Sequence, residues 1–427
     1  MNLRKFVNVL DENKMLKRIT KEVSPEYEVA ALMEQAGDCP LLFENVKGSK
    51  FPVITNICSS RELVAMSLNC EEKDILHMIA KAGNNPKDPE EKVELGYIEI
   101  EPTLEGMPIL THQKGDGGAY IASAIAVAHS EKYGMNMSFH RGMKIDNEQL
   151  VLRILPRNLQ AFREEGVNEF AFCNGVSGAV LLGAATSFEI GTSEMAIANA
   201  LSESPLIEVG GHMVPESEFV MICEFTGEEA DEGPFLDITE TLDIIRKQPV
   251  VRIKKIFARN DSIFHALLPG GPEHKVLMGM PREPTIFYEI NKEVECIDVN
   301  VTPGGGSWLH AFVSINKKDE EDGRKAIEAA FRGHKSLKHV WIVDNDIDVT
   351  KAEEVEWAMA TRFQGDKDMI VKELEKGSSL DPSSCIETRE TCKVGFDCTV
   401  PLDKNLEHFQ KPEPAMQINL DDYLEGN

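Results

Sequence analysis

The sequence predicts an α+β protein built from several domains, and three observations support this fold class. The chain has 427 residues, more than one ordinary domain holds, so two or three domains are expected. Helix and strand patterns alternate over residues 1–110, strand patterns dominate 111–298, and strand–helix alternation returns over 299–427. We therefore predict an α/β domain at each end of the chain and a strand-rich domain between them, with these three ranges as their boundaries.

The N-terminal range combines short helices with short strands. A helix is expected at 26–35, because Val29, Leu32 and Met33 fall on one face. The other elements predicted here are strands at 41–43, 51–55 and 97–101, with a polar, turn-rich loop at 84–92 before the last strand.

The central range consists mainly of short apolar runs separated by Gly, Pro and Asp turns. Several short strands at such spacing are typical of a β-barrel or a sandwich. Two helices are expected to interrupt them, at 178–185 and 193–201. Strands are predicted at 120–128, 149–155, 219–225, 250–256 and 276–280.

The C-terminal range alternates strands and helices, which indicates an α/β domain. The acidic tail at 412–427 is expected to form a short helix docked on a neighbour, or to fray. Strands are predicted at 309–315 and 339–343, and helices at 324–332 and 352–362.

Charge limits the partners of the chain. Lys and Arg number 45 against 72 Asp and Glu, a formal net charge of −27. Such a charge disfavours nucleic acid and anionic membrane surfaces as partners. An anionic substrate must therefore be met by a local cluster of basic residues.

The charged residues within the apolar runs and the pattern of cysteines indicate the cellular compartment of the protein. Charges break up the apolar residues after Met1, and no run approaches the ~18 residues of a membrane span. The nine cysteines are scattered, and Cys385, Cys392 and Cys398 fit no zinc spacing. Free thiols of this kind are typical of a reducing cytoplasm.

The clearest chemical signal combines one arginine with two carboxylates. Asn136-Met-Ser-Phe-His-Arg141 precedes the tight turn Glu232-Gly-Pro-Phe-Leu-Asp237, which has a carboxylate at each end. An arginine that meets two carboxylates can grip a substrate carboxylate while one of them delivers a proton. Taken alone, however, an acidic turn is more typical of an exposed loop.

Other candidate motifs are weaker. The glycine pair after Asp116 permits close approach of a ligand but matches no phosphate loop, so an ordinary turn is the simpler interpretation. His274 and Arg282 bracket a predicted strand and suit a second anionic group on the substrate, although surface positions are equally compatible. The acidic run from Asp344 to Asp348 lacks the Gly and Glu of a calcium loop and is expected to be a helix cap.

Decarboxylation at an sp² carbon needs an electron sink that side chains do not provide. The sequence has no recognisable lysine site for pyridoxal phosphate and no serine nucleophile elbow. A different cofactor is therefore expected if the Arg141 constellation acts on a carboxylic acid.

Five ordered motifs resemble the UbiD family of prenylated-FMN-dependent decarboxylases. The first of four motifs in the central and C-terminal ranges is Asn136–Arg141. The other three are Ser193-Glu194-Met-Ala-Ile-Ala, Glu232–Asp237 and Lys393-Val-Gly-Phe-Asp-Cys-Thr399. The fifth comprises Lys17-Arg-Ile-Thr and Leu41-Leu-Phe-Glu-Asn-Val-Lys-Gly in the N-terminal range. Together they are far more specific than any one alone, and they favour a catalytic role for the acidic turn.

The resemblance implies a fold and a set of site residues. The fold would be an N-terminal α/β domain, a central flavin-reductase-like split β-barrel, and a C-terminal α/β domain whose final helix helps the chain oligomerise. Prenylated FMN would bind with its phosphate on Mn²⁺ or another divalent cation, and with K⁺. The implied roles are catalysis by Arg141, Glu232 and Asp237, cofactor binding by Asn136, Ser138, His140, Arg141 and Lys393, and metal binding by Asn136 and Glu194.

Three departures from the family pattern are visible. Asn158, or Arg157 in another alignment, stands where a histidine metal ligand is usual, but asparagine can still ligate through its carbonyl oxygen. Leu236 replaces a glycine, which should stiffen the turn. Asp237 replaces the more frequent glutamate and has a reach shorter by one methylene.

The length of the chain resembles compact family members that act on anhydromevalonate phosphate or furan-2,5-dicarboxylate. Both substrates carry a second anion, for which His274 and Arg282 are the expected receptors. We expect reversible decarboxylation of trans-anhydromevalonate 5-phosphate in isoprenoid precursor synthesis, by a cytoplasmic homodimer or homohexamer supplied by a flavin prenyltransferase. The heteroaromatic diacid, a non-catalytic subunit of the same fold and an ordinary flavin oxidoreductase stay open as alternatives.

Overall fold

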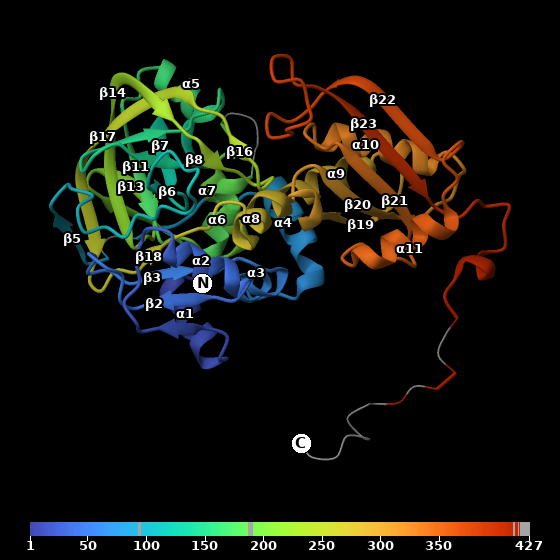
Figure 1. The fold of residues 1–427 in the computed structure, drawn as a ribbon, viewed down its shortest axis with the longest axis horizontal. Helices are drawn as coiled ribbons and strands as arrows, with labels where there is room; N and C mark the ends of the chain where they lie inside the picture. Colours follow the sequence, from blue (N-terminus) through green and yellow to red (C-terminus); the bar gives the residue numbers. More distant parts are fainter. Residues whose placement is uncertain (93–94, 187–190, 413–414, 417, 419–427) are drawn as a thin grey trace.

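The computed structural model describes residues 1–92, 95–186, 191–412, 415–416 and 418. Figure 1 shows an N-terminal part (blue) beneath a large central sheet (teal to yellow), with a separate C-terminal part (orange to red) beside them. The content is mixed α and β throughout, as predicted.

The N-terminal part is a small sheet with helices around it. Helix α1 (Leu3–Glu12) is amphipathic, and the Asn2 side chain caps it by accepting a 3.0 Å hydrogen bond from the Lys5 N–H. The sheet has the order β1-β2-β3-β18, and its last strand comes from the far end of the central region, so it joins the two parts. The other elements are β1 (Lys17–Ile19), α2 (Glu28–Ala36), β2 (Leu41–Phe43), β3 (Val53–Thr55), α3 (Arg61–Leu68), η1 (Glu72–Asp74), α4 (Ile75–Asn84) and β18 (Phe264–His265).

The central part is a nine-stranded sheet dominated by two long, antiparallel strands, β14 (Phe219–Glu232) and β17 (Arg246–Arg259). Its order is β6-β9-β10-β17-β14-β11-β7-β8, with β5 also on β17; the pairings of the described residues do not close it into a barrel. The other strands are β5 (Tyr97–Ile100), β6 (Tyr120–Ile121), β7 (Ile125–Ser130), β8 (Gly134–Phe139), β9 (Gly142–Lys144), β10 (Gln149–Leu152) and β11 (Glu169–Asn174).

Helices pack against this sheet and a second small sheet lies beside it. Helix α6 (Gly178–Ala185) is buried along its whole length, so apolar residues surround it on every side. It packs against α7 (Glu194–Leu201), which leads to the site. The remaining elements are α5 (Asn158–Glu164) and the small sheet of β4 (Glu91–Lys92), β12 (Leu206–Val209) and β13 (His212–Pro215).

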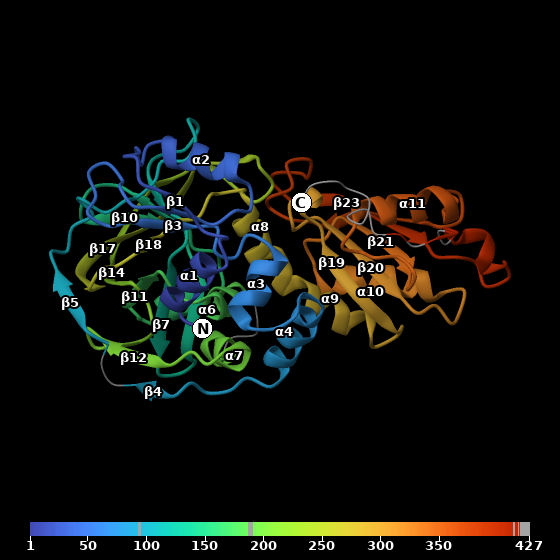
Figure 2. The same cartoon turned by 90° about the horizontal axis from the view of Figure 1, so that it is seen from below.

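The C-terminal part is a five-stranded sheet of order β19-β20-β21-β23-β22, with β20, β21 and β23 parallel. Figure 2 shows α11 on one side of this sheet and α9 and α10 on the other. This arrangement agrees with the predicted α/β domain. The elements are α9 (Glu283–Ile290), β19 (Cys296–Val301), η3 (Pro303–Gly305), β20 (His310–Ile315), α10 (Asp322–Gly333), β21 (His339–Asp344), α11 (Ala352–Arg362), β22 (Met369–Lys376), β23 (Glu390–Cys398) and η4 (Leu406–Phe409).

Some predictions for single elements need correction. The acidic run from Asp344 to Asp348 is not the cap of the next helix, α11, whose N-cap is Lys351; Asp344 and Asp346 instead pair with Arg362. The strand predicted at 276–280 is helix α8 (Pro272–Gly279) followed by η2 (Met280–Arg282), because Pro272 starts a helix well and a short apolar run does not distinguish helix from strand. The strand predicted at 120–128 divides into β6 and β7. The predicted tail helix at 412–427 falls mostly outside the described residues.

Candidate active site

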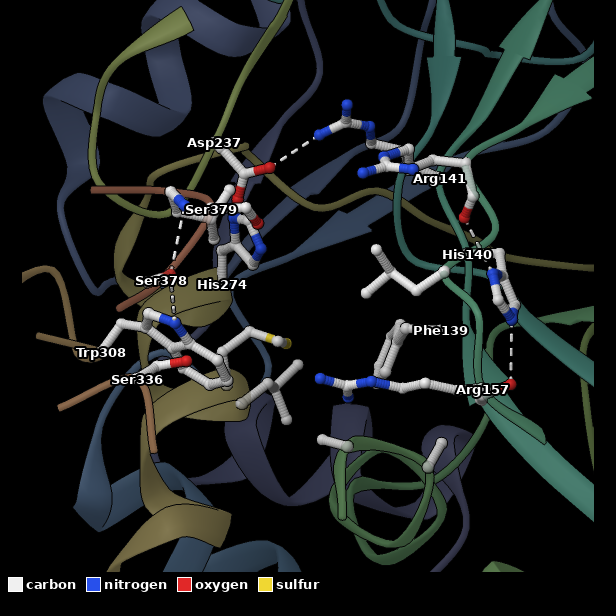
Figure 3. A pocket seen from close by; sticks show the side chains of 18 of the residues that line it. Phe139, His140, Arg141, Arg157, Asp237, His274, Trp308, Ser336, Ser378 and Ser379 are labelled. Carbon is white, nitrogen blue, oxygen red and sulfur yellow. Dashed lines mark hydrogen bonds and ion pairs between the residues drawn. The ribbon is translucent and has the colours of Figure 1, made fainter. Parts of the chain in front are cut away.

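A cavity of about 810 Å³ lies between the central sheet and the C-terminal part. Figure 3 shows Arg141 and His140 on the wall that the central sheet contributes, opposite Trp308, Ser336, Ser378 and Ser379 from the C-terminal part. The cavity is therefore built by two parts of the chain, as ligand sites between domains commonly are.

Strand β8 brings the cavity's polar groups to one face. Asn136 and Ser138 line the cavity from the strand, Phe139 lines it from the strand's last position, and His140 and Arg141 follow. The Ser138 hydroxyl lies 3.2 Å from Asn136 Oδ1 and 3.0 Å from His140 Nε2. Burial lowers the pKa of His140 to about 4, so its imidazole is neutral at physiological pH.

The predicted meeting of Arg141 with both carboxylates is confirmed. Its Nε and Nη2 donate to Glu232 at 2.9 and 3.0 Å, and its Nη1 donates to Asp237 Oδ2 at 2.6 Å. Burial alone would lower the pKa of this guanidinium, but the carboxylates outweigh it and raise the pKa above its ordinary value. The Arg141 guanidinium also lies 4.3 Å from the Phe235 ring centroid, which supports it from one side.

The acidic turn is held by the glycine pair that follows Asp116. The Gly117 N–H donates to the Pro234 carbonyl at 2.8 Å, and a Cβ on Gly117 would lie 2.2 Å from the Gly233 oxygen. The Tyr120 hydroxyl donates to Glu232 at 3.2 Å. The close approach that Gly117 allows therefore involves the acidic turn, so this segment is more than an ordinary turn.

Sequence reasoning missed a third carboxylate on the arginine. Asp243 accepts a 2.9 Å hydrogen bond from Arg141 Nη2, and it lies in the same cavity wall. The two-residue strands β15 (Phe235–Leu236) and β16 (Leu242–Asp243) form a hairpin that pairs Phe235 with Asp243. Strands this short leave no periodic signal in the sequence.

Glu194 forms a second buried carboxylate site. It accepts hydrogen bonds from the Asn136 amide at 3.1 Å, from the Met137 N–H at 3.0 Å and from the Asn158 side chain. Burial outweighs these bonds and raises the pKa of Glu194 to about 7. The structure thus brings together all three residues that were predicted to bind metal.

This donor set fits a hard divalent cation. Among the described residues no group of three or more His, Cys, Asp and Glu is arranged for a metal, so the only anionic ligand here would be Glu194. The two asparagines offer carbonyl oxygens once their amides turn, and oxygen donors are what Mn²⁺ and Mg²⁺ accept. A buried carboxylate that is hydrogen-bonded to neutral amides is the kind of group that a cation stabilises.

His274 and Arg282 line the same cavity, from helix α8 and η2. The prediction that both face one cavity is confirmed, although a helix and not a strand carries them. The Gly270 N–H donates to His274 Nδ1 at 3.0 Å, so the neutral ring carries its proton on Nε2. Burial lowers the pKa of His274, and it lowers that of Arg282 to about 10.

Lys393 is not placed with the other predicted cofactor residues. It lies on β23 in a neighbouring pocket, which shares Ser336 and Gly377 with the main cavity. Its ammonium donates to the Lys335 carbonyl at 2.6 Å, and burial lowers its pKa. Contact with a flavin phosphate stays a prediction for this residue.

The comparison with known families is specific along the chain. Residues 7–83, 86–272 and 275–398 match, in that order, the N-terminal, Rift-related and C-terminal domains of 3-octaprenyl-4-hydroxybenzoate carboxy-lyase, the domains of UbiD. The chain belongs to the UbiD family. It is a UbiD-type carboxy-lyase with the three-domain architecture of that family, which agrees with the resemblance seen in its motifs.

Curated UbiD relatives cover nearly the whole chain. Anhydromevalonate phosphate decarboxylase of Methanocaldococcus jannaschii is 40% identical over 93% of this chain and 97% of its own length. The protein of the same name from Methanothermobacter thermautotrophicus is 39% identical over 96% of this chain and 99% of its own length.

A solved UbiD-class structure has the same fold. The enzyme HmfF from Pelotomaculum thermopropionicum in complex with FMN superposes with a TM-score of 0.95 at 34% identity, covering 99% of this chain and 100% of HmfF. An evolved dimeric form of HmfF in complex with prFMN has a TM-score of 0.89. Within the described residues, none of the helices has the length and apolar character of a membrane span.

Proposed function

We propose that this chain decarboxylates trans-anhydromevalonate 5-phosphate with prenylated FMN, in isoprenoid precursor synthesis. The observation that carries the proposal is Arg141, a buried cation held by carboxylates in a cavity that also contains His274 and Arg282. The names of the archaeal relatives support this substrate. One substrate carboxylate and one phosphate match the two cationic regions of the cavity.

The cofactor and its metal would bind beside Glu194. Asn136, Glu194 and Asn158 would hold Mn²⁺ or another divalent cation at the cofactor phosphate, with Ser138 and His140 next to them. K⁺ and Lys393 complete the set that the family resemblance implies. When bound, prenylated FMN supplies the electron sink that no side chain of the cavity can supply.

Arg141 orients the substrate carboxylate in this proposal. Nε and Nη2 are occupied by Glu232, whereas Nη1 gives one hydrogen bond to Asp237 and keeps a second N–H for the substrate. A guanidinium fixed in this way cannot rotate away from the carboxylate that it binds.

Asp237 delivers the proton that replaces carbon dioxide. Its Oδ2 faces Arg141, and its Oδ1 accepts a 2.7 Å hydrogen bond from the Ile238 N–H, so the carboxyl group is held from both sides. Figure 3 shows Asp237 above His274, with its carboxylate turned toward Arg141. The shorter aspartate still reaches Arg141. Leu236, which stands where the family pattern has glycine, pairs with Leu242 in the hairpin of β15 and β16.

The second anion binds His274 and Arg282. The His274 ring is neutral and its Nε2–H is the donor left for a ligand. Arg282 is buried and donates to the Ala185 carbonyl at 2.6 Å, which fixes the direction of its guanidinium. A neutral donor and a fixed cation suit a phosphate better than an uncharged substituent.

The test is anaerobic decarboxylation by enzyme co-expressed with a flavin prenyltransferase. Anhydromevalonate phosphate, furan-2,5-dicarboxylate and simple acrylic and aryl acids are compared, with Asp237→Asn as the inactive variant and the exposed Asp231→Asn as the matched control. We expect turnover of the phosphorylated acid that is lost in Asp237→Asn and kept in Asp231→Asn.

The other outcomes identify the alternatives. Turnover of the furan diacid alone would replace the substrate, and redox activity with unmodified FMN would indicate an ordinary flavin enzyme. No turnover of any acid and no bound prenylated FMN would leave a non-catalytic relative.

Several finer features belong to the same proposal. We infer a split β-barrel for the central domain, domain boundaries at 110/111 and 298/299, and a homodimer or homohexamer. The family match of the three domains supports the architecture, and the evolved dimeric HmfF is an example of a dimer in this class. A flavin prenyltransferase would be the supplier of cofactor.

A further inference from the structure

Asp243 belongs to the arginine site although it lies outside the Glu232–Asp237 motif. Its side chain is 6% exposed and lines the cavity, with Oδ2 2.9 Å from Arg141 Nη2 and Oδ1 2.6 Å from Arg246 Nη1. Carboxylates and guanidinium groups therefore alternate in a chain that runs from Asp237 through Arg141 and Asp243 to Arg246.

The hairpin of β15 and β16 fixes this carboxylate. Phe235 pairs with Asp243, so the residue directly across from the ring that supports Arg141 is the one that binds its Nη2. The Ile244 N–H donates to Asp243 Oδ1 at 2.9 Å, and the Arg246 guanidinium is itself held by the Ile244 carbonyl at 3.1 Å. The position of Asp243 is thus set by its own strand and by two arginines.

The hydrogen bonds of Arg141 show what Asp243 changes. One Nη2 N–H binds Glu232 and the other binds Asp243, so no donor of Nη2 is left. The remaining donor is on Nη1, which already faces Asp237. Without Asp243, Nη2 would offer a second site to a substrate carboxylate, and the carboxylate would no longer be directed to the side of Asp237.

We propose that Asp243 is a positioning residue that directs the substrate carboxylate to Nη1 of Arg141, and that Asp243 and Arg246 set how strongly Arg141 holds the proton-donating Asp237. The inference rests on the proposed decarboxylation. Asp243 competes with Asp237 for one guanidinium, whereas Arg246 weakens that competition by binding the other oxygen of Asp243.

The ionisation of Asp243 agrees with this role. Burial opposes its charged form, but the bonds and charges of Arg246 and Arg141 outweigh burial and keep its pKa below the ordinary value. Asp243 is therefore a carboxylate at neutral pH. The charged and titratable groups that face this chain from neighbouring elements are Glu232, Tyr120, Arg153, His274 and the pair Lys275–Glu240.

The test uses two substitutions with opposite expected signs in the full-length holoenzyme. Asp243→Asn removes a negative charge, so Asp237 loses its proton more easily and the alkaline limb of the kcat–pH profile moves down by about one pH unit. Arg246→Gln removes a positive charge and moves the same limb up by a similar amount. Asp231→Asn, an exposed carboxylate paired with Lys247, serves as the control and leaves the limb in place.

The split between KM and kcat is a second readout. Asp243→Asn frees an Nη2 donor of Arg141, which binds the substrate carboxylate away from Asp237. We therefore expect kcat to fall about tenfold while KM stays the same or falls. If Asp243 and Arg246 had a purely structural role, the alkaline limbs of the two variants would shift in the same direction or not at all, and the losses of kcat would follow the losses of thermal stability. Either result would overturn the proposal.

Two further measurements separate the possible failures. If the wild type releases no carbon dioxide, the proposed function fails; the positioning role is then decided without cofactor, by ¹³C NMR titration of the aspartate carboxyls with Asp237→Asn as the assignment. Unchanged Asp237 titration in both variants would refute the positioning role. If circular dichroism shows that Asp243→Asn does not fold, Arg246→Gln decides alone, and the absence of an upward shift counts against the proposal.

Discussion

Two buried glutamates, Glu194 in the cavity wall and Glu232 behind Arg141, have different partners. Glu232 has no exposed surface and is paired by two hydrogen bonds with Arg141, whereas Glu194 is 3% exposed and is bonded to amides. Burial raises the pKa of Glu194 to about 7. The charge of Glu232 is balanced by a cation of the chain itself, whereas Glu194 is the carboxylate for which we propose a cation from outside.

We expect the largest effect from removing Arg141, the cation that Glu232 and two aspartates share. Arg141→Met leaves Glu232, Asp237 and Asp243 buried without the guanidinium they share, so the unfolding free energy should fall by about 3–5 kcal/mol. Urea denaturation at neutral pH measures this. The control Lys247→Met disrupts an exposed pair and should leave stability unchanged. A loss no larger than that of the control would mean that the carboxylates are not held by Arg141.

Glu194→Gln should stabilise the protein at neutral pH, whereas Arg141→Met destabilises it. The native protein keeps the Glu194 proton up to pH about 7, while the unfolded chain releases it near 4.5. Wild-type stability should therefore fall by about 3 kcal/mol as pH rises through this window, and Glu194→Gln should lose that fall. Denaturation curves from pH 4 to pH 8 measure it. Parallel curves for the two proteins would contradict the raised pKa.

Adding Mn²⁺ should distinguish Glu194 from Glu232. Mn²⁺ binds the ionised carboxylate, so it should raise the melting temperature of the wild type more at pH 8 than at pH 5. Glu194→Gln should show no such rise, and Glu232→Gln should keep it. Thermal unfolding with and without Mn²⁺ checks this expectation, and a rise in the Glu194→Gln protein would place the metal elsewhere.

Arg282→Gln tests the second anion site. We expect kcat/KM for the phosphorylated acid to fall about 10- to 100-fold, since a hydrogen bond to a charged group is worth about 1.5–3 kcal/mol. The corresponding acid without phosphate should be unaffected by the substitution. Lys275→Gln, whose ammonium pairs with Glu240, is the control. Equal losses for both acids would show that Arg282 does not recognise the phosphate.

The smallest effect concerns the turn that carries the acids. A Cβ on Gly117 would meet the Gly233 backbone oxygen at 2.2 Å, whereas on Gly118 it would meet the flexible Met143 side chain at 3.3 Å. Gly117→Ala should cost about 1–3 kcal/mol and lower kcat, because Glu232 must shift. Gly118→Ala should do neither. Denaturation and steady-state kinetics compare them, and equal behaviour of the two variants would mean that the turn is not constrained here.

Much of the fold and the main residues of the arginine site could be predicted from the sequence. The helices at 178–185 and 352–362 have the bounds that were predicted, because their residues carry the signal within a single element. Arg141, Glu232 and Asp237 were also predicted to meet, and they do. Here the information is local in the chain, in a spacing or a motif.

Features that depend on which segments pack together could not be predicted from the sequence. The apolar run from Val276 to Met280 suits a strand or a helix, and contacts with the rest of the fold made it helical. Lys393 falls in a neighbouring pocket because the register of β23 puts it there. Asp243 joins Arg141 through a hairpin of two-residue strands. Register and burial arise from contacts between distant residues, which no short window of sequence contains.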